Sequence, residues 1–262
     1  MSELVTIRKE EGIATLMLDR PEAFNAFNMD MVSTLADHLI TLAADTEIRV
    51  IIISGEGKAF CAGGDLKWAV AFPQGPPAGF HKLAARFHQA ILEIRRMPKP
   101  VIAAINGIAA GGGFSLALAC DFRVMAESAV LRQAYTSSGL CIDGGGSFTL
   151  PRLVGLARAM EIMAFDQPIS SGQALSWGLV TKVVKLESVL EETIRMAHEL
   201  AQKSIHSFGW SKRLLTDAFN TSFETHIDRE RRGLRSCAAH PEGKEGLKAF
   251  VEKRKPVFTS AG

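Results

Sequence analysis

The chain has 262 residues, of which 47% are hydrophobic and 22% charged, with a formal net charge of +2 at pH 7. This composition is typical of a globular protein with a sizeable core, and the near balance of charges argues against a dedicated nucleic-acid surface. The N-terminus carries no apolar signal-like run, and no apolar stretch long enough to span a membrane occurs. We therefore expect a cytoplasmic protein, or a matrix protein without its targeting peptide.

The cysteines predict neither a structural metal site nor a disulfide framework. They are far apart, with no CxxC pair and no histidine at metal-binding spacing. The four positions are Cys61, Cys120, Cys141 and Cys237.

The first third of the chain predicts a hairpin, a helix and a buried strand. Residues 3–9 and 12–18 alternate apolar and polar side chains around EEG, which is a hairpin signal. Asn28 can cap a helix over residues 29–44, because apolar side chains recur there at helical spacing. Residues 50–55 are a continuous apolar run, as expected for a strand covered on both faces.

The middle of the chain continues the alternation of strands and helices. Residues 101–107 repeat the apolar strand pattern, residues 114–120 follow three glycines and predict a buried helix, and residues 122–126 predict another strand. Strands that alternate with helices to about residue 190 predict an α/β core.

The last part of the chain has a different character. Its segments follow helical patterns rich in Glu, Lys and Arg: 187–205, 207–222, 223–237 and 242–253. We therefore predict two parts, an α/β core over residues 1–195 that carries the functional site and a helical region over residues 196–262. The helical region either covers the core as a terminal bundle or forms a subunit interface.

Three glycine-rich stretches, residues 59–67, 106–121 and 137–152, are the candidate functional loops. Glycine lets the backbone approach a ligand closely, and two such loops side by side can direct two N–H groups at one oxygen, as in an oxyanion hole. The same glycines could instead only permit tight packing of helix on strand. Phosphate binding is disfavoured, because no GxGxxG spacing and no GKS or GKT motif is present.

Asp143 is the candidate acid or base. It lies between an apolar triplet, residues 140–142, and three glycines, residues 144–146. Burial disfavours the charged form of a carboxylate and makes it a stronger base. Asp143 could then take a proton from a carbon that a polarised carbonyl has acidified. The alternative is that it only braces the glycine turn.

Six motifs in order resemble the crotonase (enoyl-CoA hydratase/isomerase) superfamily, over essentially the whole chain. The motifs are RPEAFNAF, AFCAGGDLK, KPVIAAINGIAAGGGFSLALACD, SSGLCIDGGGSFTLPRLVG, ISSGQALSWGLVTKVV and EGLKAFVEKRKPVF. The resemblance implies a spiral of ββα units with a C-terminal helical region that builds trimers or dimers of trimers. It also implies an acyl-CoA thioester substrate and no metal, redox cofactor, membrane or nucleic acid.

The resemblance also implies which residues bind the thioester. Family members stabilise a thioester enolate with two backbone N–H groups, which correspond here to Ala62 and Gly112. The implied coenzyme A and acyl contacts are Ala62, Gly63, Gly64, Asp65, Leu66, Gly112, Ser115, Tyr135, Lys253 and Phe258. The last two lie where family members often hold coenzyme A, sometimes across a subunit boundary.

The residues at the family's acid positions favour isomerisation. Family hydratases use two glutamates, and Ser115 and Tyr135 stand at those positions. Neither is a useful base for water at neutral pH. An acid at position 143 is typical of the family's double-bond isomerases, and the surrounding sequence is similar to the isomerases of aromatic acyl-CoA breakdown. We therefore predict an enoyl-CoA isomerase with Asp143 as its acid and base.

Other functions stay open at this point. A hydratase or hydrolase with an atypical site is one alternative, and a non-catalytic CoA-binding or scaffolding protein is another. Family dehalogenases use an aspartate at this position as a nucleophile, but that route needs a companion base, which the sequence does not identify.

Several further polar residues have structural interpretations. We expect Asp65 to cap a helix or brace a loop, and Asp121 to make structural hydrogen bonds. His81 and His88 share a helical face and either line an acyl pocket or lie on the surface. The aromatic residues that could shape a pocket for a bulky acyl group are Trp68, Phe72, Phe80 and Phe87.

Overall fold

The computed structural model describes residues 4–258 and contains two sheets. The six-stranded sheet has the order β1-β2-β3-β5-β7-β10: Val5–Glu10, Ile13–Leu18, Val50–Gly55, Val101–Ile105, Phe122–Ala126 and Lys182–Val184. The four-stranded sheet has the order β4-β6-β8-β9: Ala59–Cys61, Ile108–Ala110, Val130–Arg132 and Ile169–Ser170. All neighbours are parallel except β1 with β2 and β8 with β9. The predicted α/β class is confirmed.

The helices occupy the segments between the strands and the C-terminal region. Their bounds are α1 Met29–Ala44, α2 Leu66–Val70, α3 Pro76–Arg96, α4 Gly112–Ala119, α5 Gly146–Phe165, α6 Ser171–Ser176, α7 Val189–Ala201, α8 Ile205–Asp217, α9 Phe223–Ala239 and α10 Pro241–Val251. Short 3-10 turns span Pro21–Ala23, Thr136–Ser138 and Leu186–Ser188. Gly155 interrupts α5 with a non-helical backbone, φ 76° and ψ 161°.

Local sequence signals explain the first elements. The β1–β2 hairpin pairs Val5 with Leu18 and Glu10 with Ile13, as its alternation predicts. The Asn28 side chain accepts a hydrogen bond from the Met31 N–H at 2.9 Å, which satisfies one of the unpaired amides at the start of α1. All six residues of β3 are buried, because helices cover both faces of the sheet.

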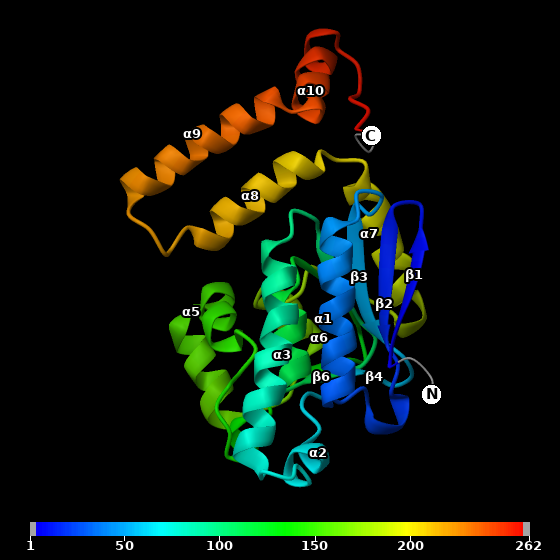
Figure 1. Ribbon diagram of the computed structural model, residues 1–262, viewed down its shortest axis with the longest axis vertical. Helices are drawn as coiled ribbons and strands as arrows, with labels where there is room; N and C mark the ends of the chain where they lie inside the picture. The colour runs from blue at the N-terminus through cyan, green and yellow to red at the C-terminus, as the bar shows by residue number, and fades with distance from the viewer. Residues whose placement is uncertain (1–3, 259–262) are drawn as a thin grey trace.

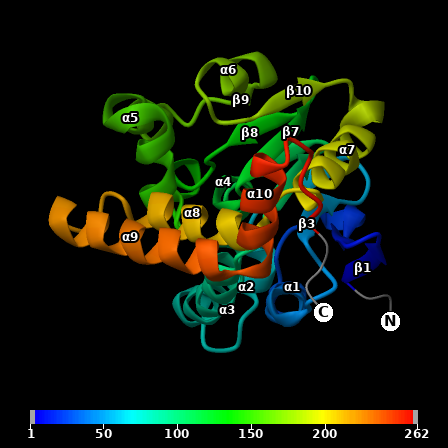
Figure 2. The same cartoon turned by 90° about the horizontal axis from the view of Figure 1, so that it is seen from above.

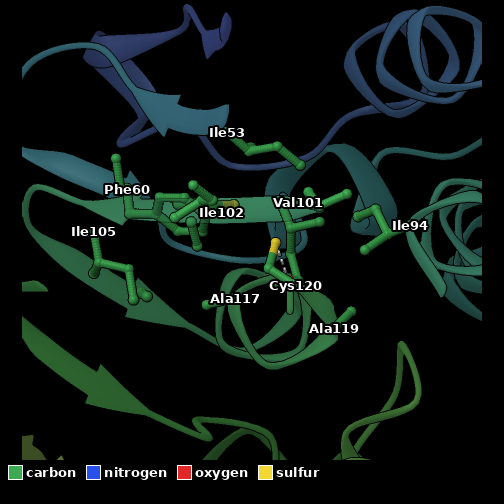
Figure 3. Close-up of a cluster of buried hydrophobic side chains, with 14 of the residues drawn as sticks. Ile53, Phe60, Ile94, Val101, Ile102, Ile105, Ala117, Ala119 and Cys120 are labelled. Carbon is green, nitrogen blue, oxygen red and sulfur yellow. Dashed lines mark hydrogen bonds between the residues drawn. The ribbon is translucent and has the colours of Figure 1, made fainter. Parts of the chain in front are cut away.

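The core lies between the six-stranded sheet and its helices. α7 packs on β3, β5 and β7, and Figure 2 shows it on the face of the sheet opposite α1 and α4. Every residue of α4 is buried. Figure 3 shows Val101 and Ile102 of β5 between Ile53 and the α4 residue Ala117. This packing holds the glycine-rich start of α4 rigidly against the sheet.

The C-terminal helices extend away from this core (Figure 1). α8 is anchored by Lys212, whose buried ammonium donates to Asp121 Oδ2 at 2.7 Å and to the Ile94 carbonyl at 2.6 Å. Asp121 also accepts the Val101 N–H, so its predicted structural role is confirmed. The predicted boundary at residues 195 and 196 falls inside α7, and Ala197, beyond that boundary, belongs to the core.

Candidate active site

A cavity of about 350 Å³ opens beside the start of α4. Its walls come from α3, the loop after β4, and the loop that carries Asp143. The apolar part is formed by Phe27, Pro77, Phe80, Leu83, Phe87 and Leu140. The polar part consists of side chains of His81, Tyr135, Cys141 and Asp143 and the backbone of Gly64 and Gly112. The cavity thus combines an apolar space for an acyl group with one carboxylate and two glycine loops.

The two glycine loops are in direct contact. Gly63 has a φ of +94°, and a Cβ placed there would lie 2.8 Å from both the Gly112 nitrogen and the Ala110 oxygen. Only a glycine allows this approach without strain. The contact places the backbone of Gly64 beside that of Gly112, which begins α4.

Hydrogen bonding decides which amide of the first loop is free. Ala62 N–H donates to the Phe24 carbonyl at 3.0 Å, and Asp65 N–H donates to the Phe27 carbonyl at 2.9 Å. Gly63 N–H points to Cys61 Sγ at 3.4 Å. Within residues 4–258, the Gly64 amide alone of these four donates to no protein acceptor.

The prediction of Ala62 as an oxyanion donor is therefore wrong, because its N–H is already used. Gly64 is the residue of this loop that lines the cavity, together with Gly112. The amide of Gly112 has no backbone acceptor among the described residues either. The start of α4 adds the positive end of the helix dipole to this amide.

Asp65 is confirmed as a brace. Its carboxylate caps α2 by accepting Trp68 N–H at 3.0 Å and pairs with Arg20 at 2.7 Å. Burial opposes ionisation, but these hydrogen bonds outweigh it and hold the pKa of Asp65 below its ordinary value. The next residue, Leu66, is 47% exposed on α2 and does not line the cavity.

Asp143 lines the cavity but is less shielded than its sequence predicts. Its side chain is 37% exposed, because Cys141 is exposed and Leu140 and Ile142 are only partly buried. Asp143 Oδ1 lies 2.6 Å from His88 Nε2. The expectation of a carboxylate enclosed by its apolar neighbours is wrong for the single chain.

The sequence did not predict that His88 contacts Asp143, which makes His88 a further candidate functional residue. His81 lies on the same face of α3, seven residues before His88, and its side chain is in the cavity wall. The pairing of His88 with Asp143 joins residues 55 apart in sequence. No local pattern carries that information, because it depends on how α3 packs against the Asp143 loop.

Ser115 and Tyr135 form a hydroxyl pair in which Tyr135 lines the cavity and Ser115 is buried behind it. Their oxygens are 3.3 Å apart, and Ser115 Oγ donates to the Asp143 carbonyl at 2.6 Å. Burial raises the pKa of the Tyr135 hydroxyl, so it stays protonated at neutral pH and serves as a donor. Neither hydroxyl can act as a base for water there.

The remaining predicted contacts are divided between the cavity and other places. Phe80 and Phe87 line the cavity, and the Phe87 ring packs on Phe27 with centroids 5.0 Å apart. Trp68 and Phe72 pack on each other with tilted rings, centroids 5.2 Å apart, and are not part of the cavity wall.

The predicted coenzyme A contacts near the C-terminus are not brought to the cavity of their own chain. Lys253 and Phe258 follow α10, which Figure 1 shows at the opposite end of the molecule from α2. Residues 4–258 contain no group of three or more His, Cys, Asp or Glu side chains that could hold a metal ion. None of the helices among these residues is long and apolar enough to cross a membrane.

Comparison with known proteins identifies the family. The family model described as enoyl-CoA hydratase/isomerase matches residues 8–261. The chain belongs to the enoyl-CoA hydratase/isomerase family. The crotonase resemblance predicted from the six motifs is confirmed.

Members of the enoyl-CoA hydratase/isomerase family with different reactions are similar to this chain. It is 36% identical to 1,2-epoxyphenylacetyl-CoA isomerase of Escherichia coli K12, covering 99% of each chain. It is 30% identical to 4-chlorobenzoyl coenzyme A dehalogenase-2 of an Arthrobacter species, covering 95% of this chain and 91% of the relative. The crystal structure of an enoyl-CoA hydratase from Polaromonas sp. JS666 superimposes with a TM-score of 0.92 at 36% identity, covering 97% of this chain and 99% of that one.

Proposed function

We propose that the protein is an acyl-CoA isomerase that shifts a double bond in an enoyl-CoA thioester. The observation that carries the proposal is a single carboxylate, Asp143, in the wall of the cavity that Gly64 and Gly112 also line. One carboxylate is enough for isomerisation, since the same group removes a proton and returns it. The 36% sequence identity to 1,2-epoxyphenylacetyl-CoA isomerase, over 99% of each chain, supports an isomerase reaction.

In the proposed mechanism, the thioester oxygen accepts hydrogen bonds from the amides of Gly64 and Gly112. With a 3-enoyl-CoA, Asp143 takes a proton from C2, and the electron pair of that C–H bond moves onto the thioester oxygen to give a dienolate. The carboxylic acid then returns the proton to C4, which leaves the double bond between C2 and C3; the reverse reaction takes the proton from C4 and returns it to C2. Removal of one oxyanion donor costs about 3 kcal/mol in known enzymes, so the two amides supply a large part of the rate.

Hydration is disfavoured as the main reaction. Addition of water needs a base that holds the water and an acid that protonates the carbon, and no second carboxylate is present in the described wall of the cavity. Ser115 and Tyr135, at the positions of the family's two glutamates, keep their protons at neutral pH.

Hydrolytic displacement is the second candidate, because His88 supplies the companion base that this reaction requires. Asp143 would attack the substrate carbon that bears a leaving group and form an ester with it. The leaving group would depart with the electron pair of its bond to that carbon. His88 would then take a proton from water as that water attacks the ester. The 2.6 Å contact between the two side chains favours this route specifically.

The apolar rings in the wall suggest a compact or cyclic acyl group. Phe27, Phe80 and Phe87 offer flat surfaces on which a ring can pack.

The predicted trimer or dimer of trimers is part of the same proposal. α8 to α10 leave large apolar side chains exposed, which monomers rarely do over a contiguous surface: Leu215, Phe219, Phe223, Ile227, Leu234, Leu247, Phe250 and Val251.

The deciding experiment is an Asp143→Asn variant assayed with a 3-enoyl-CoA. We expect turnover to fall by at least about a hundredfold, since general acid–base catalysis contributes that much, with coenzyme A thioester binding retained. Glu127→Gln, which removes a solvated carboxylate at the end of β7, is the charge-matched control. Isomerisation by Asp143→Asn at the rate of the unmodified protein would reject Asp143 as the base.

A further inference from the structure

Ser115 links the two halves of the candidate site. It lies on α4 three residues after Gly112 and is 1% exposed. Its hydroxyl donates to the Asp143 carbonyl at 2.6 Å. Since every residue of α4 is buried, this hydrogen bond ties the Asp143 loop to the most rigid helix of the core.

The glycines after Asp143 let the loop lie directly on Ser115. A Cβ at Gly146 would be 2.7 Å from Ser115 Oγ, and a Cβ at Gly144 would be 3.0 Å from Ser115 Cβ. Both distances are shorter than ordinary carbon contacts. We infer that a side chain longer than serine at position 115 would displace the Asp143 turn, residues 143–146, from its present position on α4.

Tyr135 completes the arrangement. Because Ser115 Oγ uses its proton for the Asp143 carbonyl, it has lone pairs left for the Tyr135 hydroxyl, 3.3 Å away. Three groups then form a chain in which Tyr135 donates to Ser115 and Ser115 donates to the backbone of Asp143. The chain holds the backbone of the acid and leaves its carboxylate free for the cavity.

We propose that Ser115 is a positioning residue that fixes Asp143 relative to the Gly112 amide, and that its small size determines which acid the site can use. A glutamate at position 115 and the present Asp143 turn exclude each other sterically. This inference rests on the proposed function, because it assumes that Asp143 moves the proton. It goes further by assigning the choice of acid to a residue that has no acid–base chemistry of its own.

The test compares three variants in steady-state assays with a 3-enoyl-CoA. Ser115→Ala removes the hydrogen bond, and we expect kcat to fall about tenfold to a hundredfold while KM stays within about twofold, as for a misplaced catalytic group. Ser115→Cys keeps a weak donor and should fall between Ala and the unmodified protein. Tyr135→Phe leaves the bond to Asp143 in place and should lower kcat less than Ser115→Ala.

Ser138→Ala is the matched control. Ser138 belongs to the same loop, and its hydroxyl also donates to a backbone carbonyl, that of Ala134 at 3.3 Å, but it is exposed, does not contact the acid turn through this bond and does not line the cavity. We expect unchanged kcat. Thermal unfolding of each variant separates positioning from loss of fold, since a positioning effect lowers kcat at a temperature where the variant is fully folded.

The outcomes are distinct. Full kcat in Ser115→Ala, together with an inactive Asp143→Asn, overturns the positioning role and leaves the proposed function intact. A loss in Ser115→Ala that only follows its loss of folded protein also overturns it. Full activity of Asp143→Asn overturns the proposed function itself. Ser115→Glu should lose isomerisation, and retention of full isomerase activity in that variant would contradict the steric part of the inference.

Discussion

His88 Nε2 lies 2.6 Å from Asp143 Oδ1, so a residue of α3 holds the carboxylate of the candidate acid. Both side chains are partly exposed, 48% for His88 and 37% for Asp143, and Asp143 lines the cavity whereas His88 lines a second pocket. The pair therefore combines a geometry suited to proton transfer with access for a substrate. Its chemical role differs between the two candidate reactions, and this difference can be measured.

Replacement of His88 by Gln distinguishes isomerisation from displacement. In an isomerase His88 only orients Asp143, so we expect kcat to fall about tenfold and no covalent product to form. In a displacement reaction the loss of the base would stop hydrolysis of the ester on Asp143. Intact-protein mass spectrometry after incubation with 4-chlorobenzoyl-CoA would then show an aryl ester on the protein that still carries the coenzyme A thioester. His81→Gln, on the same helical face, is the control and should show none.

An adduct in His88→Gln, with release of chloride, would establish displacement in place of isomerisation. Absence of any adduct, with turnover of a 3-enoyl-CoA by the unmodified protein, would exclude the second candidate.

The contact between the glycine loops predicts an asymmetry between two glycines of positive φ. Gly63→Ala puts a Cβ 2.8 Å from the Gly112 nitrogen, whereas Gly139→Ala, at φ +69°, has no atom within 4 Å. Gly139→Ala should lose about 1 kcal/mol of stability from backbone strain, and Gly63→Ala should lose more, because its Cβ also clashes with backbone atoms. Only Gly63→Ala should lose turnover, by about a hundredfold, because it separates the two amides. Steady-state kinetics and urea unfolding measure the two effects, and equal turnover in both variants would contradict the proposed oxyanion geometry.

The buried pair of Lys212 and Asp121 should stabilise the attachment of α8. Burial raises the pKa of Asp121, although Lys212 opposes that rise, so the carboxylate depends on its partner. Removal of one member of a buried pair typically costs 3–5 kcal/mol, and we expect about that loss in the free energy of unfolding for Lys212→Met. The double variant with Asp121→Asn should recover part of it. A loss below about 1 kcal/mol in denaturant unfolding would refute the anchoring role.

Glu242 predicts a dependence of stability on pH at the start of α10. Burial alone would raise the pKa of Glu242. Hydrogen bonds from His206 N–H, Ser204 and Arg49 outweigh burial and hold the pKa of Glu242 below its ordinary value. A carboxyl group whose pKa is lower in the folded than in the unfolded protein stabilises the fold when it is ionised. This stabilisation is fully present above the pKa of the unfolded protein and is lost as the pH falls through the pKa of the folded protein.

The free energy of unfolding of the unmodified protein should therefore exceed that of Glu242→Gln at pH 6 to 7. The two should converge as the pH falls below about 4. Denaturant unfolding over this range measures the difference, and Glu127→Gln is the control for a solvated carboxylate. Two curves that stay parallel down to pH 3 would show that Glu242 contributes no pH-dependent stability.

Local patterns in the sequence determined most of the elements and the family. The hairpin, the cap at Asn28, the buried strand β3 and the buried helix α4 follow from alternation, capping and apolar runs, which act between near neighbours in the chain. The ordered motifs predicted the family correctly because they extend over the whole chain. The element patterns did not give the extent of the core, since α7 crosses the predicted boundary and packs on the sheet along its length.

The tertiary structure alone decided the details of the site. Four consecutive amides follow β4, and only their hydrogen bonds to Phe24, Cys61 and Phe27 leave Gly64 free in place of Ala62. The pairing of His88 with Asp143 and the partial exposure of that carboxylate depend on how α3 packs against the loop. Composition and spacing fix which residues are available, but their directions and partners arise from contacts between segments that are distant in the chain.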